Sequence, residues 1–163
     1  MTPAMPVGKC LVELSSNGVD TNSRNALSFE YHGDAKILHI EPINGPVSGN
    51  TDVKVFAEGH IHNMTTCKFG SYPLVKPHTI TDAFIICKSP QVNVIQSIYI
   101  RLSNNYVDLS DSFSTFTYVE PVIIKTIYPV SGPRRGGTRV VFTGVNFINS
   151  NFTTCKFGSE ISR

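Results

Sequence analysis

A repeated segment is the feature that most constrains what this chain can fold into. Residues 65–71 read Thr-Thr-Cys-Lys-Phe-Gly-Ser, and residues 153–159 repeat the same seven letters 88 positions later. Upstream, residues 40–49 resemble residues 127–136 at an offset of 87, with two prolines and two glycines at matching places. Seven identical residues in register indicate a duplicated unit, so the chain is built from repeats.

A third match connects the beginning of the chain to its middle. Residues 14–20 (Leu-Ser-Ser-Asn-Gly-Val-Asp) resemble residues 102–108 (Leu-Ser-Asn-Asn-Tyr-Val-Asp). Together the matches divide the chain into three parts. We expect residues 1–33 to be the C-terminal part of one unit, residues 35–119 a complete unit, and residues 121–163 the N-terminal part of a third.

The composition favours β-structure. Val, Ile and Thr make up 45 of the 163 residues, whereas Ala and Leu make up 12. Branched side chains are restricted in helices and pack well on sheets. Short apolar or alternating segments predict strands at residues 37–40, 52–57, 67–69, 83–87, 97–102 and 115–118, with a hairpin turn at Asn104-Asn105. About seven strands in a unit of this length are typical of an immunoglobulin-like sandwich. The sequence therefore predicts an all-β fold with one complete and two partial sandwiches.

The junctions and the net charge limit the possible partners. The two junctions, around residues 32–36 and 119–121, contain no Gly/Ser tether, so neighbouring units should pack end to end. The formal net charge of +2 does not favour nucleic-acid binding. No apolar run approaches the roughly 20 residues that span a bilayer, so we expect no direct membrane insertion. The N-terminus lacks the apolar core of a secretory signal, which by itself would suggest an intracellular protein.

Several motifs together resemble the IPT/TIG family, the immunoglobulin-like modules shared by plexins and transcription factors. They are the Ile-x-Pro-x-x-Gly-Pro-x-x-Gly segment from Ile40 to Gly49 with its copy before Thr138, Gly-Val-Asn-Phe at residues 144–147, and Cys-Lys-Phe-Gly. Cys-Lys-Ser-Pro at residues 87–90 and a Phe-x-Tyr ending complete the set. Residues 57–60 depart from the pattern, with Ala-Glu-Gly-His in place of Gly-Val-Asn-Phe.

The resemblance implies a disulfide. In extracellular members of this family the Cys of Cys-Lys-Phe-Gly pairs with the Cys before Ser-Pro, which implies a Cys67–Cys87 bridge here. Such a bridge would contribute about 3 kcal/mol in the chain-entropy interpretation. The alternative is a pair of buried free thiols. Cys155 and Cys10 are expected to be unpaired within this segment, and Cys10 aligns with Ile98 of the complete unit.

Two acceptor sequences for N-glycosylation, like the implied disulfide, indicate an oxidising, extracellular or luminal compartment. Asn63-Met64-Thr65 and Asn151-Phe152-Thr153 each begin four residues before a Cys, at the same position of two repeats. We therefore expect N-linked glycans at Asn63 and Asn151 and an extracellular or cell-surface location. The alternative is that both Asn-x-Thr sequences were inherited through duplication of the repeat and carry no glycan.

Other candidate sites are weak. His60-Ile61-His62 would place two imidazoles on one strand face, and a metal site would need His39 or His78 as a third ligand. The basic loop at residues 133–139 is better explained as a glycine turn than as an anion site. Residues 108–111 fall short of a calcium loop. We expect no catalytic residues, no metal and no cofactor, and hence no enzyme.

The predicted function is structural. We expect an adhesive or spacer segment of a large extracellular glycoprotein, in contact with adjacent repeats and with protein partners or further copies in a filament or surface coat. Two alternatives remain open. One is the stalk of a plexin-like receptor ectodomain, and the other is an intracellular DNA-binding or dimerisation module.

Overall fold

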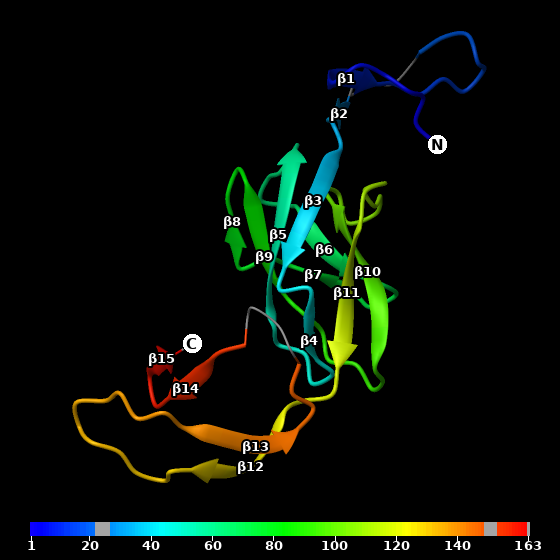
Figure 1. Ribbon diagram of the computed structural model, residues 1–163. Helices are drawn as coiled ribbons and strands as arrows, with labels where there is room; N and C mark the ends of the chain where they lie inside the picture. The colour runs from blue at the N-terminus through cyan, green and yellow to red at the C-terminus, as the bar shows by residue number, and fades with distance from the viewer. Residues whose placement is uncertain (22–26, 149–152, 163) are drawn as a thin grey trace.

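A two-layer β-sandwich occupies the middle of the chain. The computed structural model describes residues 1–21, 27–148 and 153–162, and within these residues every regular element is a strand. The predicted all-β fold is therefore confirmed. Figure 1 shows the sandwich between an N-terminal strand pair and a C-terminal group of four strands, which lie at opposite ends of it.

The sandwich consists of a five-stranded and a four-stranded sheet. The first sheet has the order β4-β11-β10-β6-β7 and the second has the order β3-β5-β9-β8. The strands are β3 (Ala35–Glu41), β4 (Asn44–Pro46), β5 (Asp52–Gly59), β6 (Thr66–Phe69), β7 (Leu74–Val75), β8 (Thr79–Ile80), β9 (Phe84–Lys88), β10 (Gln96–Ser103) and β11 (Ser114–Val119). All pairs are antiparallel except β4 and β11, which run parallel.

The core lies between the two sheets and follows the two-residue period of the strands. Phe69 and Phe116 are fully buried and meet edge to face, with ring centroids 6.1 Å apart. Tyr118 is also buried, and its hydroxyl donates a hydrogen bond of 2.9 Å to the carbonyl oxygen of Pro90. Ile98, Ile100 and Leu102 point inward from β10, as the alternation predicts. A buried aromatic pair from β6 and β11 of the five-stranded sheet therefore packs in the core of the sandwich.

The predicted hairpin turn at Asn104-Asn105 is wrong. Strand β10 ends at Ser103 and β11 begins at Ser114, so residues 104–113 form a long connection. Asn104 is buried, and the positive φ of 64° belongs to Tyr106. Asn105 makes an Asx turn in which its Oδ1 accepts hydrogen bonds from the backbone N–H groups of Val107 and Asp108.

The N-terminal strand pair has the same local structure as β10 and β11. Strands β1 (Gly8–Val12) and β2 (Leu27–Tyr31) pair with Cys10 opposite Phe29, and in the sandwich Ile98 lies opposite Phe116. The turn after each first strand is the same too, because Asn17 caps the N–H groups of residues 19 and 20 as Asn105 caps those of residues 107 and 108. The duplicated sequence thus forms the same turn twice.

The C-terminal strands begin with a copy of the β3–β5 pair. Strands β12 (Ile123–Tyr128) and β13 (Val141–Val145) pair in the same register as β3 and β5, with all positions shifted by 87. Even the irregularity repeats, between Ile37 and His39 in one pair and between Ile124 and Thr126 in the other. Strands β14 (Cys155–Phe157) and β15 (Glu160–Ser162) follow as a separate two-stranded sheet.

Candidate functional site

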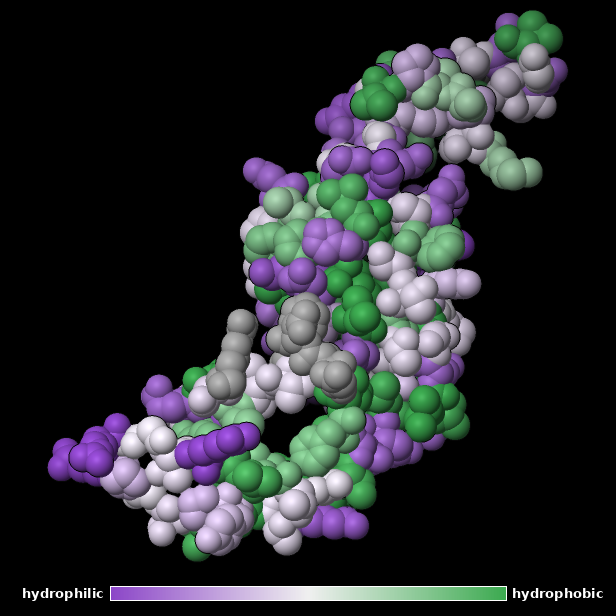
Figure 2. Space-filling view, viewed as in Figure 1, coloured by the Kyte–Doolittle hydropathy of each residue, from purple (hydrophilic) through white to green (hydrophobic). Residues whose placement is uncertain are grey.

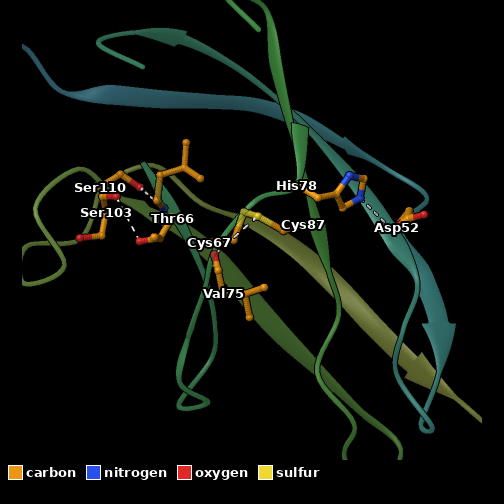
Figure 3. Close-up of a disulfide and its surroundings, with 9 residues drawn as sticks. Asp52, Thr66, Cys67, Val75, His78, Cys87, Ser103 and Ser110 are labelled. Carbon is orange, nitrogen blue, oxygen red and sulfur yellow. Dashed lines mark hydrogen bonds and ion pairs between the residues drawn. A yellow bond between two sulfur atoms is a disulfide. The ribbon is translucent and has the colours of Figure 1, made fainter. Parts of the chain in front are cut away.

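The disulfide that joins the two sheets is the best-defined chemical feature of the chain. Cys67 on β6 and Cys87 on β9 are bonded, with their Cα atoms 6.4 Å apart and both side chains fully buried (Figure 3). Because β6 belongs to the five-stranded sheet and β9 to the four-stranded sheet, the bond crosses the core. The predicted disulfide is therefore present, and it ties together strands from both layers of the sandwich.

The surroundings of the disulfide show how β6 is held in place. The Thr66 hydroxyl donates a hydrogen bond of 3.2 Å to the carbonyl oxygen of Ser103, next to the disulfide in Figure 3. Ser110 then accepts a hydrogen bond of 3.0 Å from the backbone N–H of Leu102. The loop that follows β10 is thus fastened to the sheet that carries Cys67.

The first acceptor sequence for a glycan has an exposed Asn and a buried Thr. Asn63 is exposed, and its side chain has no hydrogen bond with the described residues. The Thr65 hydroxyl is buried, donates a hydrogen bond of 2.6 Å to Oδ1 of Asn104, and accepts one from the backbone N–H of His62. The Thr therefore has a structural role in the fold. The Asn side chain is left free to carry a group on the surface.

Asn104 holds the loop that carries Asn63, a structural role that the sequence does not indicate. Its Oδ1 accepts from Thr65, and its Nδ2 donates a hydrogen bond of 2.8 Å to the carbonyl oxygen of His60. It therefore clamps the loop that carries Asn63 from a position about 40 residues away in sequence. The sequence signal at this position is the pair Asn104-Asn105, which predicts a turn, although only Asn105 caps one.

The second acceptor sequence is described in part. Asn151 lies outside the described residues. Within the described part, the Thr153 hydroxyl donates a hydrogen bond of 3.1 Å to the carbonyl oxygen of Ile148.

The remaining two cysteines lie in the N-terminal and C-terminal strand pairs. Cys10 on β1 and Cys155 on β14 are free, and each is half-buried. Cys10 stands where the complete sandwich has Ile98, and Cys155 stands where it has Cys67.

The histidine pair forms a cluster, although its third member differs from both candidates. His60 and His62 follow the end of β5 rather than lying on a strand, and their ring centroids are 4.7 Å apart. His32 joins them from the N-terminal junction and stacks on His60 at 4.8 Å. Burial and repulsion from the His62 and His32 imidazoles lower the pKa of His60. In the described part of the chain, no group of three or more His, Cys, Asp or Glu side chains has the geometry to hold a metal ion.

The other two candidate histidines have separate contacts. His39 stacks on Phe56 with ring centroids 4.2 Å apart. His78 lies 3.0 Å from a carboxylate oxygen of Asp52, which also accepts a hydrogen bond of 2.9 Å from Nζ of Lys88. The hydrogen bonds from Lys88 and then from His78 lower the pKa of Asp52. These are surface contacts on the outer face of the four-stranded sheet.

The two weak loop candidates are structural turns. In the basic loop, Gly136 and Gly137 have φ values of 78° and 82°, which is the conformational role predicted for them. In the acidic loop, the Asp108 carboxylate accepts a hydrogen bond of 2.7 Å from Nδ2 of Asn105, inside the turn that this Asn caps. Among the described residues there is also no helix long and apolar enough to cross a bilayer.

Comparison with known proteins gives one family match. The IPT/TIG domain model matches residues 121–161. Comparison with curated protein sequences finds no match.

Two solved structures of the plexin A4 full extracellular region are similar to part of the chain. The first, with domains 1 to 10, is 21% identical with a TM-score of 0.48, and covers 63% of this chain and 9% of that one. The second, with domains 1 to 8, is 19% identical with a TM-score of 0.43, and covers 57% of this chain and 9% of that one. The chain thus spans about a tenth of the length of these structures.

The matched segment contains β12 to β15, and the internal repeat relates its strands to those of the complete sandwich. Residues 121–161 therefore match the IPT/TIG domain model, and the strand pair β12–β13 within them repeats the β3–β5 pair of the complete sandwich.

Proposed function

We propose that this chain is a structural segment of an extracellular or cell-surface glycoprotein built from tandem IPT/TIG repeats. The observation that carries the proposal is the buried Cys67–Cys87 bond across the core. Stable disulfides of this kind form in oxidising compartments and are rare in the cytosol. In the chain-entropy account, a bond that closes a loop of 20 residues stabilises the fold by about 3 kcal/mol.

The exposed Asn63 supports the same location. A glycan on its side chain would extend into solvent beside β6, because the Asn is exposed while Thr65 faces the core. Since Thr65 is bonded to Asn104 in the folded protein, the acceptor sequence is available before this loop folds. Glycosylation during synthesis in the secretory pathway fits that order of events.

The short junctions support a structural role. Only residues 32–34 separate β2 from β3, and residues 120–122 separate β11 from β12. At the first junction the His32 ring stacks on His60 and ties the end of β2 to the sandwich. Successive units joined in this way have little freedom to rotate, which is the property of a spacer or an adhesive rod.

The test is the intact mass of the chain expressed with a secretory leader. We expect glycosidase treatment to lower the mass by one glycan in an Asn151→Gln variant and to have no effect in an Asn63→Gln, Asn151→Gln variant. Reduction should add the two hydrogens of one disulfide, and this increment should vanish in Cys67→Ala. A secreted chain with the mass of the bare, fully reduced polypeptide would contradict the proposal.

A further inference from the structure

The first junction, between the N-terminal strand pair and the sandwich, is built around three imidazole rings. His32 follows β2, whereas His60 and His62 follow β5, so the cluster connects two units of the repeat. The rings of His32 and His60 are stacked, with an interplanar angle of 13° and centroids 4.8 Å apart. The centroid of His62 lies 4.7 Å from that of His60 and 6.1 Å from that of His32. Each ring is therefore a direct neighbour of the other two.

The hydrogen bonds of this histidine cluster require a neutral ring at His62. The backbone N–H of Met64 donates a hydrogen bond of 3.1 Å to Nδ1 of His62, and only an unprotonated nitrogen can accept it. On His32, by contrast, Nδ1 lies 3.1 Å from the carbonyl oxygen of Gly33 and can donate to it in the neutral or the charged ring. Protonation of His62 therefore breaks a bond inside the loop that carries Asn63, and it also places a charge beside His60.

Three carboxylates surround the histidine cluster without pairing with it. They belong to Glu30 on β2, Asp34 in the junction and Asp108 in the loop after β10. Glu30 raises the pKa of His60, but its effect is the smallest there, and its carboxylate is shared with Lys9 at 3.9 Å. The two aspartates line a cavity of about 250 Å³ beside His32. Among the described residues, no carboxylate forms an ion pair with any ring of the cluster.

Protonation therefore acts against the closed junction. Partial desolvation, and then repulsion from His62 and His32, lowers the pKa of His60. An open junction, in which the rings are separated and hydrated, binds protons more readily than the closed one. By linkage, the closed junction is favoured above the ordinary pKa of 6.5 and is progressively lost as the pH falls below it.

The second junction occupies the same position in the repeat but contains no imidazole. At the offset of 87, Val119 corresponds to His32 and Phe147 corresponds to His60, and residues 79–163 contain no histidine. Val119 and Phe147 line one cavity together with residues of β4. On the face shown in Figure 2, hydrophilic residues gather where the N-terminal strands meet the sandwich, and hydrophobic residues lie near the second junction. The histidines of the first junction are therefore not a requirement of the repeat fold.

We propose that the first junction is a pH-sensitive hinge, rigid while its three imidazoles are neutral and loosened when they are protonated, whereas the second junction does not respond to pH. The inference rests on the proposed role of the short junctions as stiff connections, and it adds a condition under which one of them yields. Acidification of the kind found in endosomes would free the N-terminal unit from the sandwich without unfolding the sandwich itself.

The test is amide nitrogen relaxation of the oxidised 163-residue chain at pH 7.5 and pH 5.0. At pH 7.5, β1 and β2 should tumble with the sandwich, and a nuclear Overhauser effect should connect the rings of His32 and His60. At pH 5.0 this effect should disappear, and β1 and β2 should have a shorter correlation time than the sandwich. Strands β12 and β13 are the control in the same sample, because their correlation time relative to the sandwich should be equal at both pH values. Unchanged amide shifts in β5, β9 and β10 show that the sandwich is intact.

Exchanging the junction residues gives a sharper result. The double variant His32→Val, His60→Phe carries the residues of the second junction, so the relaxation of β1 and β2 should be the same at pH 7.5 and pH 5.0. The matched control is His39→Phe, because His39 stacks on Phe56 outside the histidine cluster. This variant should loosen at pH 5.0 like the wild type.

A wild-type junction with the same ring contact and the same relaxation at both pH values would overturn this inference and leave the proposed structural role standing. Equal loosening of the two junctions, or of the exchanged variant and the wild type, would also overturn it. Strands β1 and β2 that already move independently at pH 7.5 would contradict the stiffness of the junctions as well. A hinge that loosens as expected in a chain secreted bare and fully reduced would contradict only the proposed location.

Discussion

The β3–β5 pair and the β12–β13 pair have the same strand register and the same irregularity, yet only the first is buried. Ile37 is 6% exposed and its counterpart Ile124 is 57% exposed. The pairing of two neighbouring strands is therefore specified locally, by turn residues and alternation. Burial depends on strands from later in the sequence that supply the second sheet. The local sequence of a repeat thus specifies which strands pair, whereas burial of their apolar face requires the strands of the repeat's other half.

The largest expected effect compares Phe116 with its counterpart Phe29. Phe116→Ala should lower the free energy of unfolding by about 3–5 kcal/mol, because it leaves a cavity against Phe69. Phe29→Ala should change it by no more than about 0.5 kcal/mol, as is usual at a surface position. Urea denaturation of dilute, monomeric protein measures both values. Similar losses in the two variants would mean that the N-terminal pair shares the stability of the sandwich.

The next effect compares the two cysteine environments. The double variant Cys67→Ala, Cys87→Ala should lose about 3 kcal/mol of stability, because the unfolded chain is no longer constrained between β6 and β9. Cys155→Ala is the matched control, since Cys155 corresponds to Cys67 but is free, and it should leave the unfolding midpoint unchanged. A stable double variant would show that the bond contributes little to holding the sheets together.

A smaller effect concerns the tyrosine that ends each repeat. Tyr118→Phe should cost about 1 kcal/mol, because the hydroxyl bond to the Pro90 carbonyl oxygen is lost. Tyr31→Phe at the corresponding position should be neutral. Burial also raises the pKa of Tyr118 to about 12, so ultraviolet titration should show this phenol ionising after the exposed ones. Ionisation of all tyrosines together in the folded protein would contradict the burial of Tyr118.

The smallest expected effect is a pH dependence at the first junction. The pKa of His60 is lower in the folded chain than its ordinary value of 6.5, so the unfolded chain binds more protons in the interval just below that value. Stability should therefore fall as the pH drops through about 6.5, and His60→Gln should reduce this dependence. Thermal unfolding of both proteins as a function of pH provides the measurement. If the pH profile of stability in His60→Gln matches that of the wild type, His60 is not the cause of the pH dependence.

The features predicted from sequence were those encoded within one repeat. Alternation located the main strands, and the repeated Cys-Lys-Phe-Gly segment together with its family resemblance indicated the bond between Cys67 and Cys87. The errors concern contacts between distant segments. Nothing local shows that Asn104 turns inward to Thr65, because both its partners lie about 40 residues earlier. The stacking of His32 on His60 likewise depends on how two units meet.

The most direct test of the account is amide hydrogen exchange on the monomeric chain at low concentration. Strands β5, β9 and β10 should exchange slowly and together, because they open only when the sandwich unfolds. Strands β1, β2, β12 and β13 should exchange much faster, despite having the same pairing as their counterparts. Equal protection of β12–β13 and β3–β5 would contradict the central claim that the chain contains one complete sandwich flanked by two half-units.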